Sequence, residues 1–244
     1  MNNQLSLQEK IKKAKSVEFG KIIEDSFNLF KKVWLNGFLL VIIVAALSFG
    51  ISFIFQVLGM NYTINNFTFD SFNDFFNIYS TQLIYNIPIS LITTFSTFIL
   101  LAGFYKSCKE AGENKTELLF YFFKKEYLTK IALLSVIYTA ISIIAQTLFL
   151  IPAIYAFVPL MYFIVLFTFN PEASVGEIVE QSFVFGTKKW FITFGSVILM
   201  MIIAMFGIIA CFIGLLFTVS IVYIPVFLIY KEAIGFEDEF EVIT

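Results

Sequence analysis

The chain has no histidine and no arginine, and both absences exclude chemistry. Its 16 basic residues are all lysines. Without histidine, the chain has no imidazole to ligate a metal and no side chain with an ordinary pKa near neutral pH. Without arginine, it lacks the guanidinium fork that binds a carboxylate or phosphate through two parallel hydrogen bonds. We therefore expect no catalytic residue, no metal and no cofactor.

Charged residues are scarce as well. They make up 14% of the 244 residues, whereas 59% are hydrophobic and 33 residues are phenylalanine. An average soluble domain carries about 25% charged residues. A soluble protein could not cover this much apolar surface, so the composition predicts an integral membrane protein. A net charge of −2 without a basic tract argues against nucleic acid as a partner. Cys108 and Cys211 match no metal motif and are too few for a disulfide scaffold.

Long uncharged runs define the spans. A bilayer core of about 30 Å needs about 20 helical residues, so the runs 33–69 and 75–105 each hold one span. The runs 131–171 and 190–230 each hold two, with breaks expected at Ile151–Pro152 and between Gly207 and Gly214. We predict an all-α membrane protein with a cytoplasmic amphipathic segment (1–36), six transmembrane helices (about 37–58, 83–104, 131–150, 153–170, 191–209 and 212–230) and an acidic cytoplasmic tail (231–244).

The lysines predict the orientation. All of them fall in the segments 1–36, 105–130, 171–190 and 231–244, which the six spans place on one side of the membrane. The opposite side carries only Asp70 and Asp74, in an external loop at about 60–82 that we expect to contain a short interfacial helix. The positive-inside rule assigns the lysine side and both termini to the cytoplasm. We expect a bacterial inner (cytoplasmic) membrane protein.

A short pattern recurs along the chain and predicts an internal repeat. Residues 19–38 and 175–194 share Gly20/Gly176, Ile22/Ile178, Glu24/Glu180, Ser26/Ser182, Phe27/Phe183, Lys32/Lys188, Trp34/Trp190 and Phe38/Phe194. A fainter copy at 112–131 matches through Glu117, Phe120, Phe123, Lys124, Lys125 and Leu128. Each copy is an amphipathic segment followed by a helical hairpin. The chain is therefore expected to contain three parallel hairpin units, unlike the inverted repeats of many transporters.

Two groups of side chains stand out within this plan. Each copy ends in residues typical of membrane-interface anchors, namely Lys31, Lys32 and Trp34, then Lys124, Lys125 and Tyr127, and finally Lys188, Lys189 and Trp190. The second span carries a polar stripe on one helical face, made of Asn86, Ser90, Thr93, Thr94 and Thr97. Such a stripe favours close helix packing, and the alternative is the lining of a cavity or a substrate path.

The stretch 153–206 carries a family resemblance. It has an apolar span, a Pro-Glu turn, the sequence SVGEIVEQSF, a Lys-Lys-Trp interface and another span. This arrangement resembles the six-helix bacterial membrane proteins related to the membrane domain of glycerophosphoryl diester phosphodiesterases. In that family the membrane part can be fused to a catalytic module, and no soluble module is present here. The resemblance therefore implies the membrane fold and carries no activity over.

The residues favour a non-enzymatic role. The predicted spans contain no ionisable side chain, and such groups usually mark ion and proton relays. The amphipathic segments, with Lys10, Lys12, Lys13 and Lys15, could meet anionic lipid or a cytoplasmic protein. We expect a scaffold, or a protein that organises lipid or a partner. A permease or channel for a neutral or lipid-like small molecule is the alternative, and the oligomeric state is left open.

Overall fold

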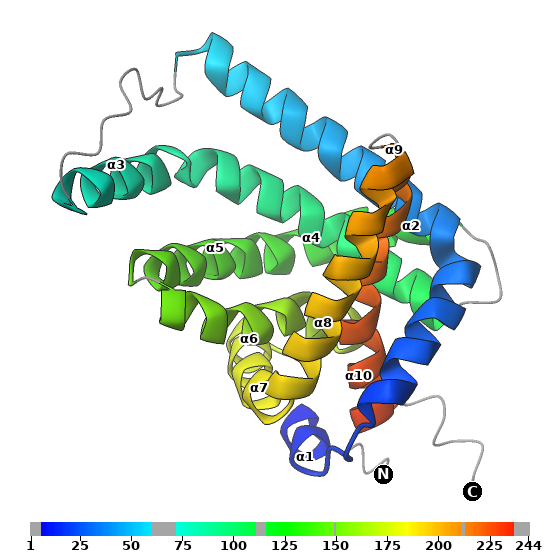
Figure 1. Cartoon of the computed structure of the whole chain (residues 1–244). Coiled ribbons are helices and arrows are strands. Elements are labelled where there is room, and N and C mark those ends of the chain that lie inside the picture. The colour runs from blue at the N-terminus through cyan, green and yellow to red at the C-terminus, as the bar shows by residue number, and fades with distance from the viewer. Residues whose placement is uncertain (1–5, 60–71, 111–115, 149, 211–212, 237–244) are drawn as a thin grey trace, which may run out of the picture.

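The structure is a computed structural model that describes residues 6–59, 72–110, 116–148, 150–210 and 213–236 (Figure 1). Within these residues the chain forms α-helices and short 3₁₀ helices (η) and no strand, which confirms the predicted all-α class. The elements are α1 (Leu7–Lys12), α2 (Phe19–Val57), α3 (Phe72–Tyr85), α4 (Ile87–Lys109), η1 (Thr116–Phe123), α5 (Lys125–Thr147), α6 (Leu150–Phe169), α7 (Val175–Lys188), α8 (Trp190–Met205), η2 (Phe206–Ala210), α9 (Ile213–Thr218), η3 (Val219–Tyr223) and α10 (Ile224–Ile234).

Six helical segments in the described part of the chain are long and apolar enough to cross a membrane. They confirm the predicted number of spans and make the chain a multi-pass membrane protein. Each overlaps one of the predicted spans. The segments are Phe19–Val57, Ile87–Lys109, Lys125–Thr147, Ile151–Phe169, Trp190–Ile208 and Gly214–Ile234.

The first of these helices differs from the prediction. We expected the amphipathic segment 1–36 to precede a separate span at 37–58, but α2 runs unbroken for 39 residues. At 1.5 Å per residue it is about 58 Å long, against a bilayer core of about 30 Å. Since no proline lies between Phe19 and Val57, nothing interrupts its hydrogen-bond ladder. Of the described residues before Phe19, those from Leu7 to Lys12 form the separate short helix α1.

Some helix boundaries are also shifted. The predicted break at Ile151–Pro152 is too late, because α5 ends at Thr147 and α6 begins at Leu150. Pro152 lies in the first turn of α6, where its missing N–H costs no helical hydrogen bond. The second span begins at Ile87 instead of about 83, because α3 ends at Tyr85. A short interfacial helix was expected within the external loop 60–82; α3 covers part of this loop, its interfacial position stays a prediction, and residues 60–71 lie outside the described residues.

α6 lies at the centre of the bundle. Its side chains from Tyr162 to Phe167 are almost entirely buried, and α7 crosses it at Gly186. A Cβ atom at Gly186 would lie 2.6 Å from the Cα of Pro159, so only glycine permits this approach. Small residues allow helix backbones to pack this closely, which matters in a membrane because lipid tails are as apolar as the side chains.

All four lysine-bearing segments are joined by contacts. Lys130 donates to the carbonyl of Pro171 at 2.6 Å, which joins the segments 105–130 and 171–190. The ammonium of Lys188 donates to the backbone carbonyl of Lys12 at 3.0 Å. The N–H of Lys15 donates to the carbonyl of Ala233 at 3.0 Å. Figure 1 shows the result: α1 lies beneath α7, near the C-terminal end of α10. The segments that the lysines mark in the sequence therefore form one end of the bundle.

Two copies of the proposed repeat share a burial pattern although their helices differ. Ile22 and Ile178 are fully buried, as are Ser26 and Ser182. The first copy is the continuous helix α2, whereas the last is divided into α7 and α8 at Lys189, and the fainter one begins as η1. The internal repeat therefore stays a prediction from the sequence.

Candidate functional site

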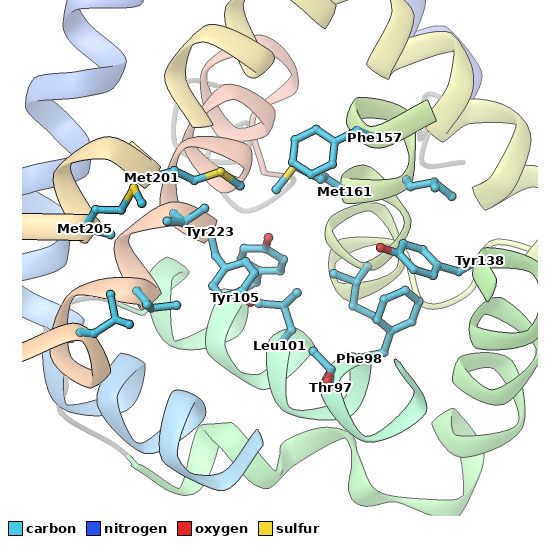
Figure 2. Close-up of a pocket in the computed structure, with 16 residues that line it drawn as sticks. Thr97, Phe98, Leu101, Tyr105, Tyr138, Phe157, Met161, Met201, Met205 and Tyr223 are labelled. Carbon is cyan, nitrogen blue, oxygen red and sulfur yellow. The ribbon is translucent and has the colours of Figure 1, made fainter. Parts of the chain in front are cut away.

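An apolar cavity of about 540 Å³ lies inside the bundle (Figure 2). Residues of α4, α5, α6, α8, α9 and η3 line it. In Figure 2, Met201, Met205 and Tyr223 lie on one side of the view, and Phe157 and Tyr138 lie on the other. The volume is within the range of about 300–1,000 Å³ that is usual for small-molecule sites.

Helical periodicity brings the lining side chains together. Thr97, Leu101 and Tyr105 are four residues apart on α4, so they share one face. Met201 and Met205 have the same spacing on α8 and face the same cavity. Each helix therefore contributes a short stripe, and the cavity exists because several such stripes face one another.

The cavity has few polar groups. Four of its lining residues, Thr97, Tyr105, Tyr138 and Tyr223, carry a hydroxyl, and no lining residue is charged. The methionines of the wall are unbranched and polarizable, so they adapt to irregular apolar shapes. This lining suits an uncharged, mostly hydrocarbon molecule that has a small number of hydrogen-bonding groups.

A smaller cavity of about 170 Å³ adjoins the first. Thr97, Leu101, Val219 and Tyr223 line both hollows. The smaller one is completed by four residues of α2, Leu40, Val41, Val44 and Ala45. The two hollows together extend from the α6 side of α4 to the face of α2. These four shared side chains form the wall between them.

The predicted polar stripe is only partly directed at these cavities. Thr97 lines both of them. Thr93 donates instead to the carbonyl of Ile89 at 2.8 Å, and the exposed Asn86 donates to the carbonyl of Gln82 at 2.8 Å. Ser90 and Thr94 are half-buried and line neither cavity. The structure therefore does not bring the whole stripe to one site.

The predicted anchors of the first copy are exposed. Lys31 and Lys32 lie on the surface of α2, and the Trp34 side chain is 45% exposed. Its ring lies 6.3 Å from that of Phe217, which stacks on Phe38 at 4.2 Å. An exposed indole beside charged lysines is the arrangement expected at a membrane interface.

The anchors at the start of α5 contact η1. Lys124 lies over the ring of Tyr121 at 4.7 Å, and Tyr127 packs edge-on against Phe122 at 5.1 Å. Hydrogen bonds from Tyr127 and Lys106 lower the pKa of Tyr121, which lies outside the spans. Lys125 is exposed.

The last pair of lysines holds the N-terminal segment. Lys188 donates to the carbonyls of Ile11 and Lys12, and Lys189 donates to the carbonyl of Lys15. Lys189 is 8% exposed, and burial, helped by the charge of Lys188, lowers its pKa. These two ammonium groups therefore cap backbone carbonyls instead of extending to lipid headgroups. Trp190 donates to the carbonyl of Tyr155 at 3.2 Å.

The sequence analysis did not identify most of the residues that line the cavity. Tyr105, Tyr138 and Tyr223 carry the signal that could have found them, since each is a tyrosine within or at the edge of an apolar run. Tyrosine usually marks the ends of a span, where its hydroxyl meets water. Periodicity alone could not reveal that the three side chains face a common hollow.

The described residues offer little for metal chemistry. They contain no group of three or more His, Cys, Asp or Glu side chains that could hold a metal ion. Cys108 is buried, and Cys211 lies outside the described residues.

Comparison with models of protein families, with curated proteins and with solved structures gives no match to this chain. The resemblance to the glycerophosphoryl diester phosphodiesterase membrane domain therefore stays a prediction from the residues alone.

Proposed function

We propose that this chain is a non-enzymatic, lipid-organising membrane protein that binds one uncharged, lipid-like molecule in the apolar cavity between α4, α6 and α8. The observation that carries the proposal is the lining, which combines a largely hydrocarbon and thioether wall with four hydroxyls and no charge. An acyl or isoprenoid chain would gain apolar contact there, and a tyrosine hydroxyl could hydrogen-bond an ester or alcohol oxygen.

A matched pair of variants tests this proposal. Ala204 lines the cavity and is 3% exposed, whereas Ile202 on the same helix is 51% exposed on the outer surface. Ala204→Phe should reduce photocrosslinking of a diazirine-bearing fatty alcohol severalfold, because the ring occupies the hollow. Ile202→Phe should leave the labelling unchanged. If Ala204→Phe does not fold, Ala204→Leu serves in its place, with gel filtration in detergent as the check on folding.

Equal labelling of the two variants would contradict the proposal, since the probe would then be bound at the outer surface. The site of attachment gives a second, independent readout. Peptide mapping should place the label on lining side chains such as Met201 or Tyr223. A label restricted to the outward-facing residues of α2 would also count against the cavity.

Transport of such a molecule is a second candidate function, favoured by the adjoining cavity. The two hollows share a wall at Thr97, and a path through the bundle would need such consecutive compartments. Thr97→Leu should then slow transfer of a fluorescent lipid across proteoliposomes, and Thr94→Leu, which lines neither hollow, should not. Equal rates for empty and protein-containing liposomes would exclude this function for the lipid tested.

We further propose that the membrane is a bacterial inner membrane and that the lysine-bearing end faces the cytoplasm. The support is the positive-inside rule together with the mutual contacts of the lysine segments. A cysteine at Lys31, which is exposed, should resist a membrane-impermeant maleimide in intact cells and react after the cells are opened. Labelling in intact cells would reverse the orientation.

A further inference from the structure

A third hollow, of about 690 Å³, lies between α2, α4 and α10 and differs in chemistry from the apolar cavity. We call it the polar groove. Its floor is apolar and includes Cys108 and Phe227, both of which are buried. Its walls carry charges of both signs, from Lys32, Lys109 and Lys231 and from Asp25, Glu110 and Glu232.

The polar groove lies at the depth of lipid headgroups. Lys32 is the last charged residue before the uncharged run 33–69. Lys231 is the first charged residue after the run 190–230. Since these runs form the spans, the groove is at the boundary between the hydrocarbon and the water, where phospholipid phosphates lie and attract lysine side chains.

Several of these charges are not neutralised within the protein. Glu232 is already occupied, because both of its oxygens accept from Lys21 at 3.0 Å. Among the described residues, no ion pair or hydrogen bond engages the ammonium of Lys32 or of Lys231. The carboxylates of Asp25 and Glu110 form no ion pair or hydrogen bond in the described part of the chain either, although the charge of Asp25 is one of the lesser causes that raise the pKa of Lys21, after Glu232. The groove therefore presents two cations and two anions around one hollow.

We propose that the polar groove binds the headgroup of a zwitterionic phospholipid with a primary ammonium, that is, a phosphoethanolamine headgroup. Lys32 and Lys231 meet its phosphate, and Asp25 and Glu110 meet its ammonium. A purely anionic headgroup would leave the two carboxylates facing more negative charge, and a purely cationic one would face the lysines. A quaternary ammonium is a poorer ligand because it has no N–H to donate to a carboxylate.

This site does not depend on the proposed function of the apolar cavity. The buried rings of Tyr105 and Phe227, stacked at a centroid distance of 6.4 Å, lie between the apolar cavity and the polar groove. A headgroup could therefore occupy the groove whether or not the cavity holds a ligand. The Ala204→Phe variant, which fills the cavity, should bind the headgroup as the wild type does.

Thermal unfolding of the full chain in detergent micelles tests the proposal, with the fluorescence of Trp34 and Trp190 as the signal. Dihexanoyl phosphatidylethanolamine should raise the Tm more than the phosphatidylcholine or phosphatidylglycerol with the same chains. Lys32→Gln should weaken the apparent affinity about tenfold, the usual effect of losing one charge-assisted hydrogen bond. Lys31→Gln is the matched control, since Lys31 is exposed on the same helix but lies outside the groove.

Asp25→Asn examines the other half of the headgroup. It should reduce the preference for phosphatidylethanolamine over phosphatidylglycerol, because it removes a partner of the ammonium and a charge that repels the anionic lipid. Equal stabilisation by the three lipids in the wild type, or equal affinities of Lys32→Gln and Lys31→Gln, would overturn the proposal. Soluble O-phosphoethanolamine should not change the Tm at the same concentration. If it raised the Tm as much as the lipid does, the ligand of the groove would be a soluble molecule and not a lipid.

Discussion

The close approach of η1 to α4 allows a quantitative test of the packing. A Cβ atom at Gly103 would lie 2.6 Å from the carbonyl carbon of Leu119, whereas ordinary contacts of this kind begin near 3.4 Å. The backbone of η1 would therefore have to move by about 0.8 Å. It is not free to do so, because Leu119 is fully buried and the ring of Tyr121 lies 3.1 Å below the ammonium of Lys106.

Gly103→Ala should consequently destabilise the protein by about 1–3 kcal/mol, the usual cost of overpacking a core. Gly50→Ala is the control, since a Cβ atom at Gly50 meets nothing within 4 Å. That change should stabilise the protein by about 0.5–1 kcal/mol, because alanine is the better helix former. The two variants should then differ by about 1.5–4 kcal/mol. For a chain of this size that is a difference of about 3–16 °C in Tm.

Thermal unfolding in detergent, followed through tryptophan fluorescence, measures this difference. Gly103→Ala should unfold below the wild type, and Gly50→Ala at or slightly above it. If Gly103→Ala unfolded at the same temperature as Gly50→Ala, η1 would not pack on α4 as closely as described, and the reasoning would be refuted.

Three further predictions concern Lys189, Thr193 and Lys188. Because burial lowers the pKa of Lys189 below 10.5, the unfolded chain binds more protons than the folded chain between that lowered pKa and 10.5. The contribution of this residue to stability therefore rises with pH through the window. The difference between the Tm of the wild type and that of Lys189→Met should increase as the pH is raised. A difference that did not change with pH would contradict the buried charge. Thr193→Val should cost about 1–3 kcal/mol, since the buried Tyr162 hydroxyl loses its partner at 2.6 Å. Adding Tyr162→Phe should recover part of that loss in urea unfolding, and a further loss would argue against the hydrogen bond. Lys188→Met should raise hydrogen exchange in α1 about tenfold, because Ile11 and Lys12 lose the donor to their carbonyls; unchanged exchange in α1 would show that this lysine does not hold it.

The number and approximate position of the spans could be predicted because the bilayer imposes a length on every uncharged run. The ends of the helices could not. Pro152 has no N–H to donate to the carbonyl of residue 148, so the helix is interrupted four residues before the proline, at the end of α5, and not at the proline itself. The continuity of α2 was missed for a different reason, because lysines on a helix mark where it leaves the lipid and not where it ends.

Which face of each helix is buried and which is exposed was harder still to predict. In a soluble protein the apolar side of a helix is the buried side, but in a membrane both the lipid and the core are apolar. Phe19 and Trp34 are large apolar residues of the amphipathic segment expected at residues 1–36, and they are 43% and 45% exposed. Thr93 shows the same ambiguity, since a hydroxyl that returns to its own helix looks identical in the sequence to one that lines a site.

The cavity itself follows from a departure from regular helix. Pro225 indicates an irregularity in the last span, because it has no N–H to donate to the carbonyl of Ile221, but it does not indicate a 3₁₀ helix or a cavity. The last span is divided into α9, the 3₁₀ helix η3 and α10. In a 3₁₀ helix the side chains at i and i+3 eclipse, and Val219 and Val222 have this spacing and both line the cavity. An uninterrupted α-helix would turn these two side chains about 60° apart and would place a different set toward α4. The 3₁₀ helix ends at Tyr223, about one turn before Phe227, whose ring closes the cavity off from the polar groove. The local 3₁₀ geometry therefore shapes the wall of the apolar cavity, while the regular helix that follows it supplies Lys231 and the floor of the headgroup site.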